Sequence, residues 1–376
     1  MESPTLHSTR SRPSTPMRSG RSSSRSAYPG TPSRRRSPKK VSLLQLSKLS
    51  LQTADTSVEL DSVVILDFSR RYITAGFPGT PLPVGKLESD VVPVWGLTED
   101  VEDKNLSVRL ELMLHRVFYE LLLIDPRKYR VMAVVPALMS EGFQRLISDL
   151  ILGRFGASSI IFNSSSPFTM VASGSRNGLV VVIDWEETVV MPVIDFRDMT
   201  PLARVSARGG KWVFDNIREA IEQDITFNSI EKLLGQLDLS STLSGDETVA
   251  YNGGSVAKAG LISAIKKALF STDGEKDDEG EFPIDAVTTK VLQSLDVAGR
   301  GDVLENVVVT SDINIPGLTQ CFADCLRKSY PKLRVIESEG SWCGASLYLS
   351  SVGWFFSHED RALFPGELQR EKRVVS

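Results

Sequence analysis

The sequence predicts a two-lobed α/β fold built by duplication of a smaller unit. From about residue 58, short runs of β-branched residues alternate with segments of helical periodicity, a pattern typical of α/β folds. Two of these runs, at 63–68 and 180–185, share one pattern, since each ends in an aspartate followed by an aromatic residue. Each is followed by a second strand-like run, which indicates two equivalent halves with a cleft between them. Two unrelated buried strands are the alternative.

Residues 1–57 precede this body and differ from it in composition. They are rich in Ser, Arg, Pro and Thr, with almost no large apolar residues before Val41. Residues 1–40 hold ten Lys or Arg against one acid, a charge of +9; the whole chain carries −4, which leaves −13 for the remainder. Such a segment cannot bury enough apolar surface to offset its ordering entropy. We therefore expect a disordered basic tail.

The tail contains three Ser/Thr-Pro-x-Lys/Arg sites, at Thr15, Thr31 and Ser37. They are candidate targets of proline-directed kinases, and each phosphate would cancel roughly 1.5 to 2 positive charges. Chance matches in a solvated tail are the alternative. A basic tail also suits nucleic acid or the acidic surface of microtubules. Because Tyr28 is the only aromatic residue there, we expect no direct nucleic-acid contact.

The body is predicted to alternate strands and helices in chain order. Strands are expected at 63–66, 72–77, 129–135, 159–162, 179–183, 188–194 and 306–310. Helices are expected near 106–124, 140–154, 210–223, 254–270, 284–296, 316–329 and 342–352. The acidic, glycine-containing stretch 273–281 is expected to be an exposed loop.

Composition excludes several classes of protein. The cysteines and histidines are scattered without metal-ligand spacing or a disulfide framework, which fits a reducing compartment. Cys321 and Cys325 stand one helical turn apart and are expected to be small core residues. No apolar run reaches about 18 residues, so we expect no membrane span. The first residues lack the pattern of a signal peptide.

Five motifs, in the right order, resemble the actin family. They are 67–77, Phe118-Tyr119-Glu120 with 129–136, Ala172-Ser173-Gly174 with Gly178, 307–317 and 342–347. The resemblance covers 58–355. It implies the ribonuclease H-like duplicated fold of actin over 58–376, with a first half at about 58–174, a second at about 175–355 and a C-terminal extension at 356–376. It also implies a vestigial nucleotide cleft that contains Asp67, Asp184, Gly209, Gly210 and Lys211.

The first phosphate loop departs from the family pattern. Arg70 and Arg71 stand where the family has Ser and Gly, and Thr74 replaces the lysine that meets the phosphates. A phosphate cradle needs glycines, because only a residue without Cβ lets backbone N–H groups approach the oxygens. We expect the two arginines to block this loop.

The second loop and the adenosine motif depart further. Glu186 and Glu187 would repel a triphosphate, and no glycine remains in that turn. Thr310 and Ser311 replace the paired glycines of the adenosine motif, and Ser165 stands where a glutamine positions the attacking water. Hydrolysis needs a positioned water, a metal and charge stabilisation together. We therefore expect a degenerate ATPase site without catalytic residues, metal or cofactor; ATP or ADP with Mg²⁺ as a static ligand is the alternative.

Within the family, the chain resembles the actin-related class at the pointed end of dynactin. The region between Phe77 and Tyr129 is short, whereas 133–156 and 315–355 are well kept. A protomer with one intact end caps a filament but does not extend it. The resemblance implies partners among dynactin filament and pointed-end subunits, indirect links to dynein and microtubules, and a place in the cytoplasm and cytoskeleton. The alternatives are a nuclear subunit of a chromatin-remodelling complex and an ATPase with a divergent pocket.

Overall fold

The computed structural model describes residues 62–88, 104–221, 225–241, 247–251, 254–270 and 281–352. The chain divides into two units, Met1–Lys40 and Val41–Ser376, and every described residue belongs to the second. The predicted tail at 1–57, with Thr15, Thr31 and Ser37, lies outside the described residues. So do the extension at 356–376 and all of the acidic stretch except Glu281.

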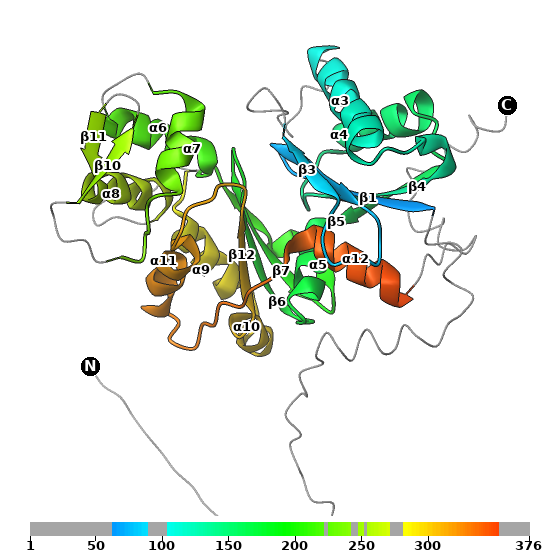
Figure 1. Ribbon diagram of the computed structural model, residues 1–376. Helices are drawn as coiled ribbons and strands as arrows, with labels where there is room; N and C mark the ends of the chain where they lie inside the picture. Colours follow the sequence, from blue (N-terminus) through cyan, green and yellow to red (C-terminus); the bar gives the residue numbers. More distant parts are fainter. Residues whose placement is uncertain are drawn as a thin grey trace, which may run out of the picture. The chain divides into compact units, whose positions relative to one another are not determined.

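The first half is built on a five-stranded sheet of order β3-β2-β1-β4-β5 (Figure 1). Its strands are β1 (Val63–Phe68), β2 (Tyr72–Gly76), β3 (Gly85–Glu88), β4 (Arg130–Val135) and β5 (Ser159–Ser164). β1 pairs antiparallel with β2 and parallel with β4. Successive side chains of a strand point to opposite faces. Val64 and Leu66 therefore enter one core, and Val63 and Ile65 enter another.

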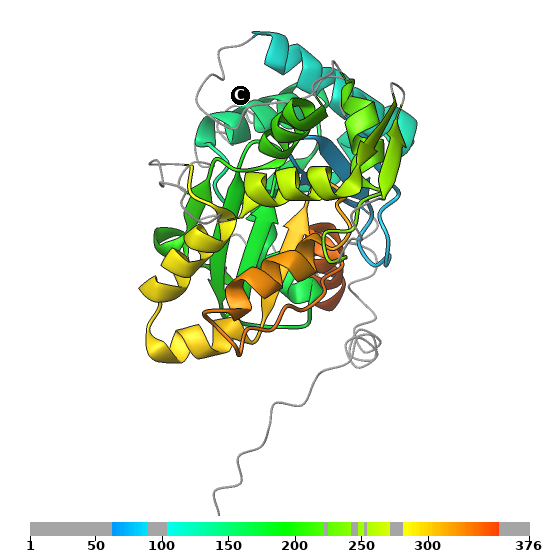
Figure 2. The ribbon, with the colours of Figure 1, turned by 90° about the vertical axis from the view of Figure 1, so that its left-hand side faces the viewer.

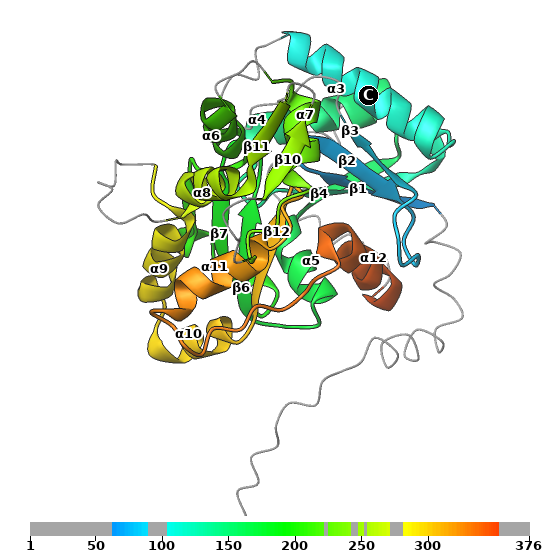
Figure 3. The same cartoon turned by 60° about the vertical axis from the view of Figure 1, so that its left-hand side comes forward.

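Helical segments cover both faces of this sheet. The core of Val64 and Leu66 is completed by α3 (Lys104–Arg116), the π-helical turn η2 (Val117–Leu121), α4 (Glu141–Ser148) and the π-helical turn η4 (Asp149–Arg154), with the short η3 (Pro126–Lys128) nearby. The opposite face packs on α5 (Ser165–Ala172) and α12 (Gly340–Val352). Figure 3 shows α5 and α12 side by side, as in Figure 1.

The second half repeats the arrangement with strand order β12-β6-β7-β8, and β9 also pairs with β7. Its strands are β6 (Gly178–Ile183), β7 (Thr188–Ile194), β8 (Arg197–Asp198), β9 (Arg204–Ser206) and β12 (Val307–Ser311), with η5 (Thr200–Leu202) between β8 and β9. The helices are α6 (Gly210–Ile221), α7 (Phe227–Leu234), α8 (Lys258–Leu269), α9 (Ile284–Ser294), α10 (Val297–Leu304) and α11 (Leu318–Arg327). A ribbon of β10 (Thr248–Tyr251) and β11 (Gly254–Ala257) precedes α8. Figure 2 shows α8 and α11 in front of the second sheet.

The predicted duplication is confirmed by the topology. β6 and β7 form an antiparallel hairpin and β12 pairs in parallel with β6, as β4 does with β1. α5 joins the halves, because its Phe168 belongs to the core against β1 and its Met170 to the core against β6. Cys321 and Cys325 lie in or against the core of the second half, as expected.

Some predicted boundaries were wrong. The helix expected at 254–270 begins at Lys258, because 254–257 pair with β10 as β11. The helices expected at 106–124 and 140–154 are α-helical only to Arg116 and Ser148 and continue as π-helical turns. The elements that the sequence did not predict are α5, α7, α10, β3, β8, β9 and β10. Within the described ranges, no helix has the length and apolar character needed to cross a bilayer.

Candidate functional site: charged contacts between the two hairpins

The turn between β1 and β2 directs two arginines into the interior. Ser69 donates its backbone N–H to the Tyr72 carbonyl at 2.9 Å. Its hydroxyl accepts the N–H groups of Arg71 and Tyr72, both at 3.2 Å. The turn is therefore tight, and Arg70 and Arg71 are each only 1% exposed. Burying a guanidinium is costly unless it is paired and hydrogen-bonded, so the partners of these side chains define the site.

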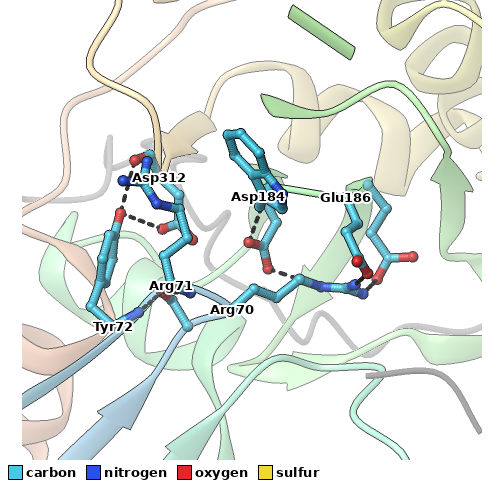
Figure 4. A network of polar contacts seen from close by, with 9 residues as sticks. Arg70, Arg71, Tyr72, Asp184, Glu186 and Asp312 are labelled. Atoms are coloured by element: carbon cyan, nitrogen blue, oxygen red, sulfur yellow. Dashed lines mark hydrogen bonds and ion pairs between the residues drawn. The ribbon is translucent and has the colours of Figure 1, made fainter. Parts of the chain in front are cut away.

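Arg70 spans the space between the two hairpins and pairs with three acids of the β6–β7 turn (Figure 4). Its Nη1 and Nη2 donate to Glu186 and Glu187, and its Nε lies 3.4 Å from Asp184 Oδ2. The sequence predicts that these glutamates repel a phosphate and that the arginines block their loop. The structure adds that the charged side chains of the two loops pair with each other.

Arg71 makes a second set of contacts. Its Nη2 donates to Glu231 of α7 at 2.7 Å and to Glu88 of β3. The guanidinium carbon lies 4.9 Å from the centre of the Phe227 ring and 5.6 Å from that of Trp185, within cation–π range. Burial opposes the charge of Arg71, but Glu231 and Glu88 outweigh it and raise the pKa of Arg71.

An aromatic cluster lies beneath Arg71. Trp185 meets Phe214 edge-on at 4.8 Å and Phe227 at 5.2 Å between ring centres, while Phe214 and Phe227 stack at 4.5 Å. The aromatic residue that follows the aspartate of the second hairpin is thus a core residue as well as a neighbour of the guanidinium.

Tyr72 makes a further contact between the two sheets. Its hydroxyl donates to Asp312 Oδ1 at 2.8 Å, and its oxygen lies 3.0 Å from the Asp312 carbonyl oxygen. Asp312 follows β12 directly. Lys86 of β3 places its Nζ 3.0 Å from the centre of the Tyr72 ring. Burial lowers the pKa of Lys86.

The two aspartates predicted for the cleft have different surroundings. Asp67 accepts a hydrogen bond from the Ser341 hydroxyl at the start of α12. Burial raises the pKa of Asp67 to about 7, against the effect of Ser341. Burial, followed by the charge of Asp312, also raises the pKa of Asp184 well above its ordinary range. Burial thus makes both carboxyls harder to ionise than an exposed aspartate.

Gly209, Gly210 and Lys211 lie against the β6–β7 turn. The N–H of Gly210 donates to the Asp184 carbonyl at 2.9 Å, and that of Lys211 to the Trp185 carbonyl at 2.7 Å. A Cβ on Gly209 would stand 2.7 Å from the Asp184 carbonyl oxygen and 2.8 Å from the Glu187 nitrogen. The first N–H groups of a helix ordinarily attract anions. Here, two of those of α6 are already bonded to the chain.

These residues do not fit a nucleoside triphosphate with its magnesium. The N–H groups of Gly210 and Lys211 have backbone partners. The Arg70 guanidinium is paired with acids, and those acids would repel phosphate oxygens. In the part of the chain that the structure describes, no three His, Cys, Asp or Glu side chains converge as metal ligands.

The remaining predicted positions lie in regular elements. Thr310 and Ser311 stay in register with Val182 and Ile183 of β6. Ser165 opens α5, where its carbonyl accepts the Thr169 hydroxyl. Thr74 pairs with Lys86 across β2 and β3, so the lysine near Asp67 comes from the neighbouring strand.

The site also contains residues that were not predicted from the sequence, among them Tyr72, Lys86, Glu88, Phe227, Glu231, Asp312 and Ser341. A signal existed for the central contact, because two arginines and two glutamates occupy equivalent turns of the duplicated hairpins. Glu231 had no such signal, since α7 was not predicted.

Comparison with known families agrees with this topology. A family model for actin matches residues 101–281. Over these residues, about half of the chain, the sequence is similar to the actin family. The match includes the β6–β7 hairpin, its acids and the start of α6, whereas the two arginines precede it. The duplicated α/β fold is thus actin-like.

Proposed function

We propose that this actin-family protein is a non-catalytic subunit that acts through its surfaces. The observation that carries the proposal is the buried Arg70 guanidinium, paired with Glu186 and Glu187. In-line hydrolysis needs donors that are free to stabilise the developing charge on phosphate. At this site the Arg70 guanidinium is paired with acids, and the N–H groups of Gly210 and Lys211 are bonded to backbone carbonyls.

We propose more specifically that the protein caps the pointed end of the dynactin actin-like filament. Two features support this role. The segments at 133–156 and 315–352 form strands and helices that pack against the cores of both halves. By contrast, β3, α3, η2 and η3 are the only elements described between Phe77 and Tyr129. Extension of a head-to-tail filament needs two complementary surfaces, whereas a cap needs one.

The partners that follow from this proposal are the dynactin filament and pointed-end subunits, with indirect links to dynein and microtubules. The protein would then act in the cytoplasm, on the cytoskeleton. It would support dynein-driven transport by closing the filament and holding the other pointed-end subunits, without binding nucleic acid.

The test is purification of the protein from native cells with its partners and any bound nucleotide. Dynactin subunits, with adenine nucleotide far below one per chain, are expected. Remodeller ATPases in place of dynactin subunits would defeat the pointed-end assignment. ATP turnover that disappears in Asp67→Ala would defeat the non-catalytic assignment.

A further inference from the structure

Two arginines from one turn connect the first half of the domain to the second. Arg70 reaches Glu186 and Glu187 in the β6–β7 turn, and Arg71 reaches Glu231 on α7. We call these five residues the arginine clamp. Both arginines lie in the turn between β1 and β2 of the first sheet, and all three acids belong to the second half. The clamp therefore joins elements more than a hundred residues apart in sequence.

The burial of the clamp is asymmetric. The arginine side chains are 1–2% exposed, whereas those of Glu186, Glu187 and Glu231 are 29%, 24% and 36% exposed. If the halves separated, Arg70 would lose its charged partners and Arg71 would keep only Glu88 of its own half. The acids would regain water at little cost, but Arg70 would be left unpaired if it stayed buried. The arginines therefore favour the closed arrangement.

The surroundings of Arg71 reinforce this preference. Its guanidinium is a flat cation beside the Phe227 and Trp185 rings, with Glu231 as a hydrogen-bond acceptor. Aromatic faces and a carboxylate together hold a planar guanidinium better than either does alone. The hydrogen bond from the Tyr72 hydroxyl to Asp312 is a further contact between the two halves.

We propose that the arginine clamp replaces an exchangeable nucleotide as the link between the two halves. A nucleotide is a separate molecule whose departure or hydrolysis can change the angle between the domains that hold it. The clamp is part of the chain, so the closed arrangement is permanent and independent of any ligand. This inference deepens the proposed function, since a cap without a nucleotide cycle presents one fixed surface to its partners.

Hydrogen exchange on the full chain tests the inference. The reporters are the amides of Ser69, Asp184, Gly210 and Lys211, which bond within or against the two turns. Arg70→Glu faces Glu186 and Glu187 with a like charge, so these amides should exchange about tenfold faster or more. The triple variant Arg70→Glu, Glu186→Arg, Glu187→Arg restores the pairing with reversed signs and should return exchange to within about twofold of the natural chain.

Arg145→Glu is the matched control, because Arg145 and Glu141 form an exposed pair on α4. It should leave exchange at the reporter amides unchanged. If Arg70→Glu does not fold, Arg70→Lys keeps the charge and loses the forked contact, and it should give a smaller increase than tenfold.

Two results would overturn the clamp. One is unchanged exchange at the reporter amides in both Arg70 variants. The other is slower exchange in the natural chain when Mg²⁺ and ATP are added. Nucleotide content measured on the same samples separates the two proposals. Bound nucleotide contradicts the nucleotide-free subunit, whereas unresponsive amides without nucleotide contradict only the clamp.

Discussion

Asp67 is a buried carboxyl held by the start of a distant helix. It is the next-to-last residue of β1, and its partner is the Ser341 hydroxyl of α12. Lys86 and Asp312 act on it through their charges, with opposite effects. Burial has a larger effect than either charge and raises the pKa, so this carboxyl keeps its proton to an unusually high pH.

The raised pKa makes stability depend on pH. Between about 4, where the unfolded carboxyl titrates, and about 7, where the folded one does, only the folded state holds this proton. The contribution of Asp67 is therefore complete below pH 4 and is lost as the pH rises to 7. Asp67→Asn should raise the free energy of unfolding at pH 7.5 by up to about 4 kcal/mol. Urea unfolding from pH 5 to 8 measures this.

The asparagine should also reduce the pH slope, leaving the part that comes from Asp184, whose pKa is shifted in the same direction. Asp215→Asn, at an exposed position of α6, is the control and should change neither value. A slope in Asp67→Asn equal to that of the natural chain would show that this carboxyl is already ionised in the folded state.

Close backbone contacts require a glycine at position 209. A Cβ there would stand under 3 Å from three backbone atoms of the β6–β7 turn, and backbone atoms cannot rotate away. Gly209→Ala should lower the free energy of unfolding by about 2 kcal/mol or more, as overpacking does. Gly260→Ala, in a helix with open space around it, should be neutral or stabilising by up to about 1 kcal/mol. Parallel urea titrations compare the two; equal effects would refute the close contact.

Among the elements, α5 and α12 are in direct backbone contact. A Cβ on Gly344 of α12 would lie 1.8 Å from the Phe168 carbonyl oxygen of α5. Gly344→Ala should therefore push the helices apart and cost about 3 kcal/mol or more, at the upper end of overpacking effects. Thermal unfolding followed by circular dichroism reports the loss. Ser351→Ala, at an exposed position near the end of α12, should leave the melting temperature nearly unchanged.

Strands were predicted better than helices for a physical reason. A buried strand such as β6 is a short, continuous β-branched run, and its limits follow from composition. By contrast, α5 carries Ser165, Ser166, Thr169 and apolar residues without a polar face, because it is packed between two cores. The sequence of α5 therefore shows no helical alternation of polar and apolar residues. The strand β11 was mistaken for helix because only its pairing with β10 distinguishes it.

Half of the candidate site could be predicted, for the same kind of reason. Asp184, Gly209, Gly210 and Lys211 come together as the family pattern implies. The pairing of Arg70 with Glu186 depends on the distance between two turns 116 residues apart, which no local pattern contains. The charges are visible in the sequence. The sequence does not show whether these charged side chains face a ligand or pair with each other.

At the scale of the whole molecule, duplication explains why the clamp could arise. Equivalent hairpins from the two halves face each other, as the contacts of Arg70 with Glu186 and Glu187 show. Basic residues on one turn and acidic residues on the other can then pair without any change in the strands that carry them. Removing one partner of such a buried pair is strongly destabilising, because the other charge stays buried and unpaired. A change in one turn therefore requires a matching change in the other.

If the protein caps a filament, exposed apolar residues of the segments at 133–156 and 315–352 should contact the filament. Tyr348 of α12 is 41% exposed and Leu138, between β4 and α4, is 36% exposed. A minority of contact residues, clustered near the centre of an interface, cost more than about 1 kcal/mol of binding free energy when truncated to alanine. Tyr348→Ala and Leu138→Ala should each weaken capping of dynactin filaments by about tenfold. Val297→Ala, at an 86% exposed position outside these segments, should cap normally. Filament length against protein concentration measures all three, and equal potency would place the contact surface elsewhere.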